Sequence, residues 1–199
     1  MKTLLRMSSE RIRSLPGTNS HGTPLRVKPP NYKEEKLRMT FTQQDQTTRD
    51  QATLFDSIRE IFEQKIPFNR VLGLRVVSLD HEIARLRFTM NEALIGNYMR
   101  GSMHGGVISS VIDVTGGLAA FLGMQAKLPD EPLTKRLRRF EKLGTIDLRI
   151  DYLTPGIGEW FEATGHVLRA GKKVAVTRIE LCNQAKKRIA VGTGAYVIA

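Results

Sequence analysis

The sequence predicts an α+β domain in which an antiparallel sheet of about six strands wraps around one long central helix. A segment from about residue 104 to 123 has helical length and is apolar on nearly every side, so protein must surround it. Strand-like segments follow it at 145–153, 160–169, 173–183 and 188–198. A sheet beside one helix that needs burial on all sides implies that the sheet curves around that helix.

The N-terminal half of the domain adds one helix and two strands. Apolar residues recur at helical spacing over 48–64, which predicts an amphipathic helix. Strands are predicted over 74–79 and 83–90, followed by a glycine-containing loop over 91–103. The basic, proline-bearing segment 128–143 is interpreted as a solvent-facing insertion.

The C-terminal strands are predicted to form an antiparallel meander. Turn residues lie between successive strands at Pro155-Gly156, at Gly171-Lys172 and over 183–187. Connections this short favour antiparallel pairing of strands that are neighbours in the chain. We therefore expect one domain over 46–199, with its core over 66–199.

Residues 1–45 differ from the rest of the chain. They carry several prolines and many basic residues without periodicity, which is typical of a flexible extension. This segment is either a solvated tail or an arm that binds an anionic partner or wraps a subunit. A transit peptide is also compatible with the basic start, although Glu10 and the short apolar runs weaken that interpretation.

Charge and cysteine content narrow the function classes. The net charge is +11, which favours a polyanionic partner such as nucleic acid, a membrane surface or the phosphates of coenzyme A. The single cysteine excludes an intrachain disulfide and a cysteine-rich metal site. We expect no metal or redox cofactor, and a reducing, cytoplasmic location.

Asp113 is the only formally charged residue between Gly101 and Ala126. A carboxylate in an apolar helix costs several kcal/mol unless it is paired or put to use. Two interpretations stay open from the residues alone: a buried Asp satisfied by backbone, serine or arginine partners, or a catalytic carboxylate.

His104, Gly105 and Gly106 precede or begin the same helix, where backbone N–H groups have no helical partner. Such donors and the positive helix end stabilise a developing oxyanion. Asp113 lies about 13 Å further along the axis, too far to act on the same carbonyl within one subunit. It could meet the Gly105 end of a second copy. The alternative is an ordinary capped junction between loop and helix.

The run His104-Gly105-Gly106, the Asp nine residues after the His and Gly116-Gly117 together resemble the signature of hotdog-fold acyl-CoA thioesterases of the phenylacetate-pathway (PaaI-like) type. The segment 144–155 resembles a strand of that family that ends in an aromatic residue, a short residue and proline. The turn 169–173 before a strand is also similar. The resemblance covers about residues 66–199.

This resemblance implies a homodimer or homotetramer with active sites at the subunit interface. Asp113 would be the nucleophile or general base, the Gly105 N–H would polarise the thioester carbonyl, and His104 would position the loop. Thr145 falls where related enzymes carry a Ser or Thr that orients water, or it is simply a residue at a strand start. Asn97 is a weaker candidate, because related enzymes have the Asn six residues before the His and not seven.

The substrate would be an acyl-CoA. Gly106 would let the CoA part approach the backbone closely, and basic side chains would bind its phosphates. The alternative is that these side chains are ordinary surface charges. The basic candidates are Arg169, Lys172, Lys173, Arg136, Arg138 and Arg139.

Three other functions stay open. One is a hotdog hydratase or dehydratase, which usually pairs a His with an acid on the helix. The second is a non-catalytic acyl-CoA-binding protein. The third, nucleic-acid binding, lacks a reading motif, and aromatic residues make up only 7% of the chain. Membrane insertion is not expected, because the longest apolar stretch is short and contains Asp113.

Overall fold

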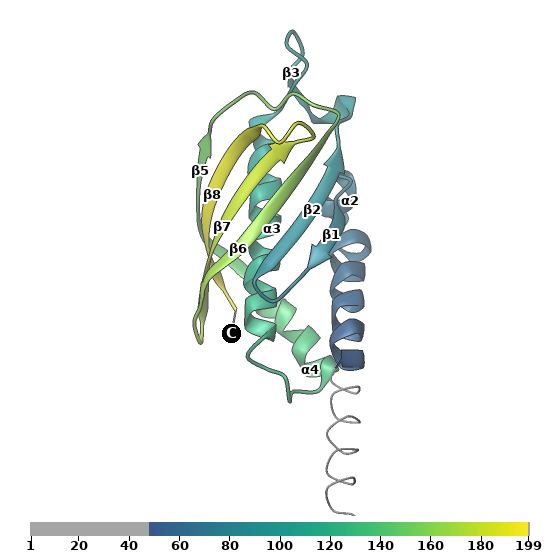
Figure 1. The fold of residues 1–199 in the computed structure, drawn as a ribbon, viewed down its shortest axis with the longest axis vertical. Coiled ribbons are helices and arrows are strands. Elements are labelled where there is room, and N and C mark those ends of the chain that lie inside the picture. Colours follow the sequence, from purple (N-terminus) through teal and green to yellow (C-terminus); the bar gives the residue numbers. More distant parts are fainter. Residues whose placement is uncertain (1–47, 199) are drawn as a thin grey trace, which may run out of the picture. The chain divides into compact units, whose positions relative to one another are not determined.

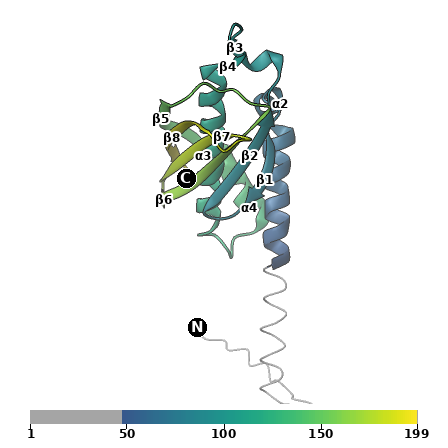
Figure 2. The same cartoon turned by 45° about the horizontal axis from the view of Figure 1, so that its top comes forward.

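A computed structural model describes residues 48–198 of the chain. The predicted N-terminal extension over 1–45 lies outside the described residues. Figures 1 and 2 show the described part from two directions.

Helical segments open the described chain. Residues 48–60 are α-helical and continue into a π-helical turn, η1 (Ile61–Lys65). The short helix α2 (Pro67–Val71) follows, and its proline stands at the start, where a missing N–H costs nothing. Leu54, Ile58 and Phe62 are all buried. Their spacing of four residues places them on one face, which packs against the domain core.

The six-stranded antiparallel sheet confirms the predicted fold class (Figure 1). Its strands, in spatial order, are β1 (Arg75–Leu79), β2 (Ile83–Thr89), β6 (Trp160–Ala170), β7 (Val174–Asn183), β8 (Arg188–Val197) and β5 (Gly144–Tyr152). Alternate residues of β2, β6 and β7 are buried, so one face of the sheet covers the helix.

One predicted pairing is wrong. We expected β5 to pair with β6 through a turn at Pro155-Gly156, whereas β5 pairs with β8, for example Leu148 opposite Gly194. Both sides of β6 are already occupied by β2 and β7, so the free edge of β8 accepts β5. The segment 153–159 crosses over the sheet end as a loop (Figure 1). It is anchored where the Met103 N–H donates to the Gly156 carbonyl at 2.9 Å.

The central helix α3 (Gly105–Gln125) is the predicted core helix. By length and composition it could cross a membrane, yet 72% of its most apolar window is buried inside the protein. Two strand glycines let the helix approach the sheet closely. A Cβ at Gly165 would lie 2.9 Å from the Thr115 carbonyl oxygen, and one at Gly192 would collide with Ile112. The sequence prediction of a helix surrounded by protein therefore agrees with the packing of α3.

The segment 128–143 is not the purely solvent-facing insertion that we expected. It contains α4 (Leu133–Arg138) and the 3₁₀ turn η3 (Arg139–Lys142), and Leu133, Leu137 and Phe140 pack against the core. Arg136 is only 7% exposed. Its guanidinium donates to the side-chain and backbone oxygens of Gln125, and burial lowers the pKa of Arg136. Apolar residues at helical spacing among the basic ones explain why the segment folds back.

Candidate active site

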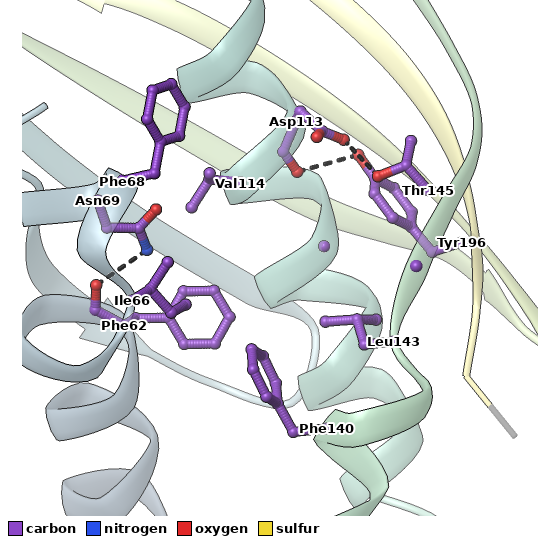
Figure 3. Close-up of a pocket in the computed structure, with 12 residues that line it drawn as sticks. Phe62, Ile66, Phe68, Asn69, Asp113, Val114, Phe140, Leu143, Thr145 and Tyr196 are labelled. Carbon is purple, nitrogen blue, oxygen red and sulfur yellow. Dashed lines mark hydrogen bonds between the residues drawn. The ribbon is translucent and has the colours of Figure 1, made fainter. Parts of the chain in front are cut away.

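Asp113 lies midway along α3 and is half-buried. The Thr145 hydroxyl, on the edge strand β5, donates a hydrogen bond of 2.8 Å to Asp113 Oδ1 (Figure 3). A hydroxyl that donates to a carboxylate fixes the direction in which the carboxylate points. Two residues that are 32 positions apart in the sequence therefore meet in one place.

Tyr196 is a third member of this group, which the sequence analysis missed. It lies on β8, is 2% exposed, and its hydroxyl donates to the Asp113 carbonyl oxygen at 3.1 Å. Gly116 and Gly194 leave room for it, because a Cβ at either position would collide with the tyrosine hydroxyl. Burial raises the pKa of Tyr196, and the Asp113 charge raises it further. Tyr196 is therefore a protonated donor that holds the turn of α3 that carries Asp113.

A pocket of about 200 Å³ opens beside these residues (Figure 3). Its polar end is formed by Asp113 and Thr145, and the rest is mainly apolar, with walls from the N-terminal helices, α3 and the insertion. The lining residues are Phe62, Ile66, Phe68, Asn69, Asp113, Val114, Gly117, Phe140, Leu143, Gly144, Thr145 and Tyr196. We call this the inner pocket. It combines a carboxylate with an apolar cavity, as a site that acts on an acyl group requires.

The start of α3 forms a separate group. His104 is the N-cap residue, and its Nδ1 accepts from the Gly106 N–H at 2.8 Å. The Gly105 carbonyl accepts from the Tyr152 hydroxyl at 3.2 Å. Gly105 is the first residue of α3, where backbone N–H groups have no partner within the helix. This geometry suits a loop-positioning role for His104 and an oxyanion-binding role for Gly105.

Gly105 lines a second cavity, of about 340 Å³, between the helix start and the crossing loop. Its walls are Ser102, Met103, Gly105, Ile108, Tyr152, Leu153, Thr154, Pro155 and Gly156. Asp113 and Thr145 line the inner pocket instead. Asp113 lies eight positions after Gly105 on the helix, which is about 12 Å along the axis. One copy of the chain thus holds the two groups at different places.

Asn97 is in neither group. It ends β3 (Ile95–Asn97), which pairs with β4 (Ser102–Met103) in a hairpin beside the start of α3. Its side-chain oxygen accepts from the Arg100 N–H at 3.2 Å, which closes the hairpin turn. The structure shows a turn residue that is exposed to solvent, and a substrate contact by Asn97 stays a prediction.

The predicted CoA-binding residues are dispersed. Arg169, Lys172 and Lys173 are exposed around the turn between β6 and β7. This turn lies by the end of α3, since Lys127 contacts the Ala170 carbonyl, and so it is remote from Gly105 and Gly106 within one copy. Of the basic residues in the insertion, Arg136 is engaged by Gln125, Arg139 donates twice to Glu131, and Arg138 is exposed.

The apolar lining of the inner pocket was not anticipated. The helical pattern over 48–64 indicated that Phe62 is buried, but nothing in the spacing connected it with Asp113. Gly116 in the core helix and Gly194 in the strand were the one sequence signal for Tyr196, because glycine at such positions indicates a close approach.

Comparisons with known proteins identify the family of the chain. Residues 100–190 match the family described as the thioesterase superfamily. The chain is 42% identical over 144 residues to the medium/long-chain acyl-CoA thioesterase YigI of Escherichia coli strain K12. The aligned region covers 71% of this chain and 91% of YigI.

Solved structures give the same result. A Shewanella oneidensis protein related to the thioesterase superfamily superimposes with a TM-score of 0.72 and 42% identity, over 75% of this chain and 97% of that chain. The PaaI protein of E. coli, from the phenylacetic acid degradation operon, has a TM-score of 0.58 at 21% identity, over 73% of this chain and 93% of its own; at that identity it shows the fold alone. The resemblance found in the sequence is confirmed: the chain belongs to the thioesterase superfamily and has its hotdog fold.

Proposed function

We propose that this protein hydrolyses acyl-CoA thioesters to a free carboxylic acid and CoA, with Asp113 as nucleophile or general base. One observation carries the proposal: the Asp113 carboxylate is oriented by Thr145 at the end of an apolar pocket. An apolar pocket places an acyl group, and a fixed carboxylate next to it supplies the base or nucleophile that hydrolysis needs.

In the proposed reaction, Asp113 either removes a proton from water as the water attacks the thioester carbon or attacks that carbon itself. The Gly105 N–H stabilises the oxyanion that develops on the carbonyl oxygen. The C–S bond then breaks, CoA leaves as a thiolate that takes up a proton, and in the covalent route water releases the acyl group from Asp113. These steps require water, a carboxylate and a polarised carbonyl, so we propose a reaction without a metal or redox cofactor.

We propose that one complete site uses two copies of the chain. Asp113 and Gly105 are about 12 Å apart along one helix, and they line different cavities. In a homodimer, or in a homotetramer built from dimers, Asp113 of one copy would meet Gly105 of another. This arrangement would also explain how exposed basic residues distant from Gly105 in one copy, namely Arg169, Lys172 and Lys173, reach the phosphates of CoA bound near Gly106 of the other.

The proposed substrates are medium- and long-chain acyl-CoAs. The relative YigI is named for this class, and aromatic and aliphatic side chains form most of the inner pocket. A cytoplasmic location belongs to the proposal as well, because acyl-CoA is an intracellular metabolite class and the one cysteine is a free thiol.

Thiol release by the purified protein, measured over acyl-CoAs from acetyl to palmitoyl and one aromatic acyl-CoA, tests the proposal. The expected result is turnover that is highest for the medium or long chains and is lowered about 10²–10⁴-fold in Asp113→Asn. Mass spectrometry of the products must show the free acid, which only hydrolysis produces. Hydration of an unsaturated acyl-CoA would leave the thioester intact and release no thiol. Saturable acyl-CoA binding without thiol release would instead establish a binding protein and overturn the enzymatic proposal.

A further inference from the structure

The inner pocket adjoins a second apolar space, with which it shares two lining residues. A groove of about 520 Å³ runs between the N-terminal helix and the insertion. We call it the outer groove; its lining residues are Ile61, Lys65, Ile66, Thr134, Leu137, Arg138, Phe140 and Glu141. Ile66 and Phe140 line both spaces. These two side chains are therefore the boundary between them.

Phe140 is held in place at this boundary. Its ring makes edge contacts with Phe62 at 5.6 Å and with Phe121 of α3 at 5.7 Å between ring centroids. In Figure 3, Phe62 and Phe140 lie at the opposite end of the inner pocket from Asp113 and Thr145. Asn69 fixes the facing wall, since its Nδ2 donates to the Phe62 carbonyl oxygen at 2.9 Å.

The inner pocket is too small to enclose a long acyl chain. Its volume of about 200 Å³ lies below the range of about 300–1,000 Å³ in which proteins bury drug-sized ligands. The outer groove lies within that range. A chain that starts with its thioester at Asp113 and fills the inner pocket has its next apolar surface beyond Ile66 and Phe140.

We propose that the acyl tail runs from Asp113 through the inner pocket, passes between Ile66 and Phe140, and ends in the outer groove. The insertion 128–143 is then the element that sets chain-length preference, with Phe140 as the constriction and α4 as a wall of the tail site. This inference rests on the proposed acyl-CoA hydrolysis and adds to it the route of the tail. Each methylene that enters the groove leaves water and strengthens binding about fourfold.

The charges beside the groove do not change this assignment. Lys65 pairs with Glu60 at 3.3 Å, and Lys65, Arg138 and Glu141 are all exposed side chains of mixed sign. Four of the other lining residues are aliphatic or aromatic, namely Ile61, Ile66, Leu137 and Phe140. An apolar floor with charged edges fits a hydrocarbon tail better than the phosphates of CoA.

Blocking the outer groove from its exposed edge tests the proposal. Thr134→Trp and Glu141→Trp each place a large ring in the groove from a solvent-exposed position, so the fold is not at stake. Lys135→Trp and Lys142→Trp are matched controls, because their parent residues are neighbours in the chain, are exposed, and line neither space. The measurement is the ratio of kcat/KM for palmitoyl-CoA to that for octanoyl-CoA, below the concentration at which palmitoyl-CoA forms micelles.

The expected result is a ratio lowered on the order of tenfold in both groove variants, because at least two methylenes lose their apolar contact, and an unchanged ratio in both controls. An unchanged ratio in the groove variants would overturn the tail route. Equal losses for acetyl-, octanoyl- and palmitoyl-CoA would also overturn it, since the groove would then bind the CoA part. Failure of the hydrolysis proposal is a separate result, in which the unmodified protein releases no thiol from any acyl-CoA.

Discussion

The two candidate halves of the active site belong to one helix but are held in different ways. The cap at the helix start is formed by neighbours in the chain, because His104 Nδ1 accepts from the N–H of Gly106 two residues later. Tyr152 of β5 adds one distant hydrogen bond, to the Gly105 carbonyl oxygen. The group around Asp113 is held by distant strands, through Thr145 on β5 and Tyr196 on β8. The cap is therefore a local structure with one distant contact, whereas the group around Asp113 exists only when the sheet has closed around α3.

This difference has a consequence for substitutions. At the helix start, we expect the backbone N–H of Gly105 to be the group that matters for activity. A proline at this position can remove that N–H without disturbing the start of the helix. Around Asp113, side chains from three elements act together, so a change in any of them alters both geometry and stability.

The largest effect is expected for Asp113→Asn, which keeps the shape of the side chain and removes its charge. We expect kcat/KM for the best acyl-CoA to fall about 10²–10⁴-fold, the usual contribution of a general base. Asp147→Asn is the control, because Asp147 is an exposed residue of the same strand as Thr145. Activity in Asp113→Asn near that of the control would remove Asp113 from the mechanism.

The next largest effect on activity is expected for Gly105→Pro. Proline at the first helical position fits the helix and lacks only the N–H, and His104 already has the extended conformation (φ −65°, ψ 137°) that precedes proline readily. Removing the oxyanion donor should lower kcat about 10²–10³-fold. Gly105→Ala keeps the N–H, and its Cβ would meet Tyr152 at an ordinary 3.6 Å, so it should retain most of the activity.

Mixing these two inactive variants tests whether the halves come from different copies. The two variants are unfolded together and refolded as a mixture, so that half of the dimers contain one copy of each. If Asp113 of one copy works with Gly105 of the other, each mixed dimer holds one intact site of its two. The mixture should then recover about a quarter of the wild-type activity. A mixture that stays as inactive as its components would show that the site does not combine the halves in this way.

Thr145→Ala is expected to have a smaller effect. Loss of one hydrogen bond to a charged group corresponds to about a tenfold fall in kcat, with KM for the acyl-CoA changed little because Asp113 is misdirected and the apolar walls remain. Thr145→Ser keeps the hydroxyl and should restore most of kcat. A loss in the serine variant equal to that in alanine would mean that the methyl group, and not the hydrogen bond to Asp113, is important.

Tyr196→Phe should affect mainly stability. The lost hydrogen bond to the Asp113 carbonyl costs about 1 kcal/mol in the free energy of unfolding. Since the pKa of Tyr196 is raised in the folded state, its unfolded form ionises first as the pH rises above about 10. Stability should therefore be fully present below pH ~10 and fall above it. The fall in the free energy of unfolding should be smaller in Tyr196→Phe, which lacks the titrating hydroxyl. Denaturant titrations of both proteins at pH 8 and pH 11 measure the two effects. An equal fall in both proteins would contradict the assignment of the pH dependence to Tyr196.

Much of the fold followed from local patterns. Periodicity predicted α3 as a buried helix and located each of the six sheet strands within a few residues. The pairing of β5 could not be predicted in this way, because the length of the loop 153–159 is compatible with pairing to β6 or with a crossover. The free edge of β8 decided between them, and that edge exists only in the assembled sheet.

The same limit applies to the candidate site. The sequence by itself determined that one carboxylate lies in an apolar helix and that His104 can cap its start, because both depend on residues within a few positions of each other. Only the tertiary structure decided that Thr145 and Tyr196, which are 32 and 83 positions from Asp113, contact it, and that the basic insertion lines an apolar pocket. The entropic cost of closing a loop changes slowly with its length, so sequence spacing does not select such partners; the packing of the whole core does.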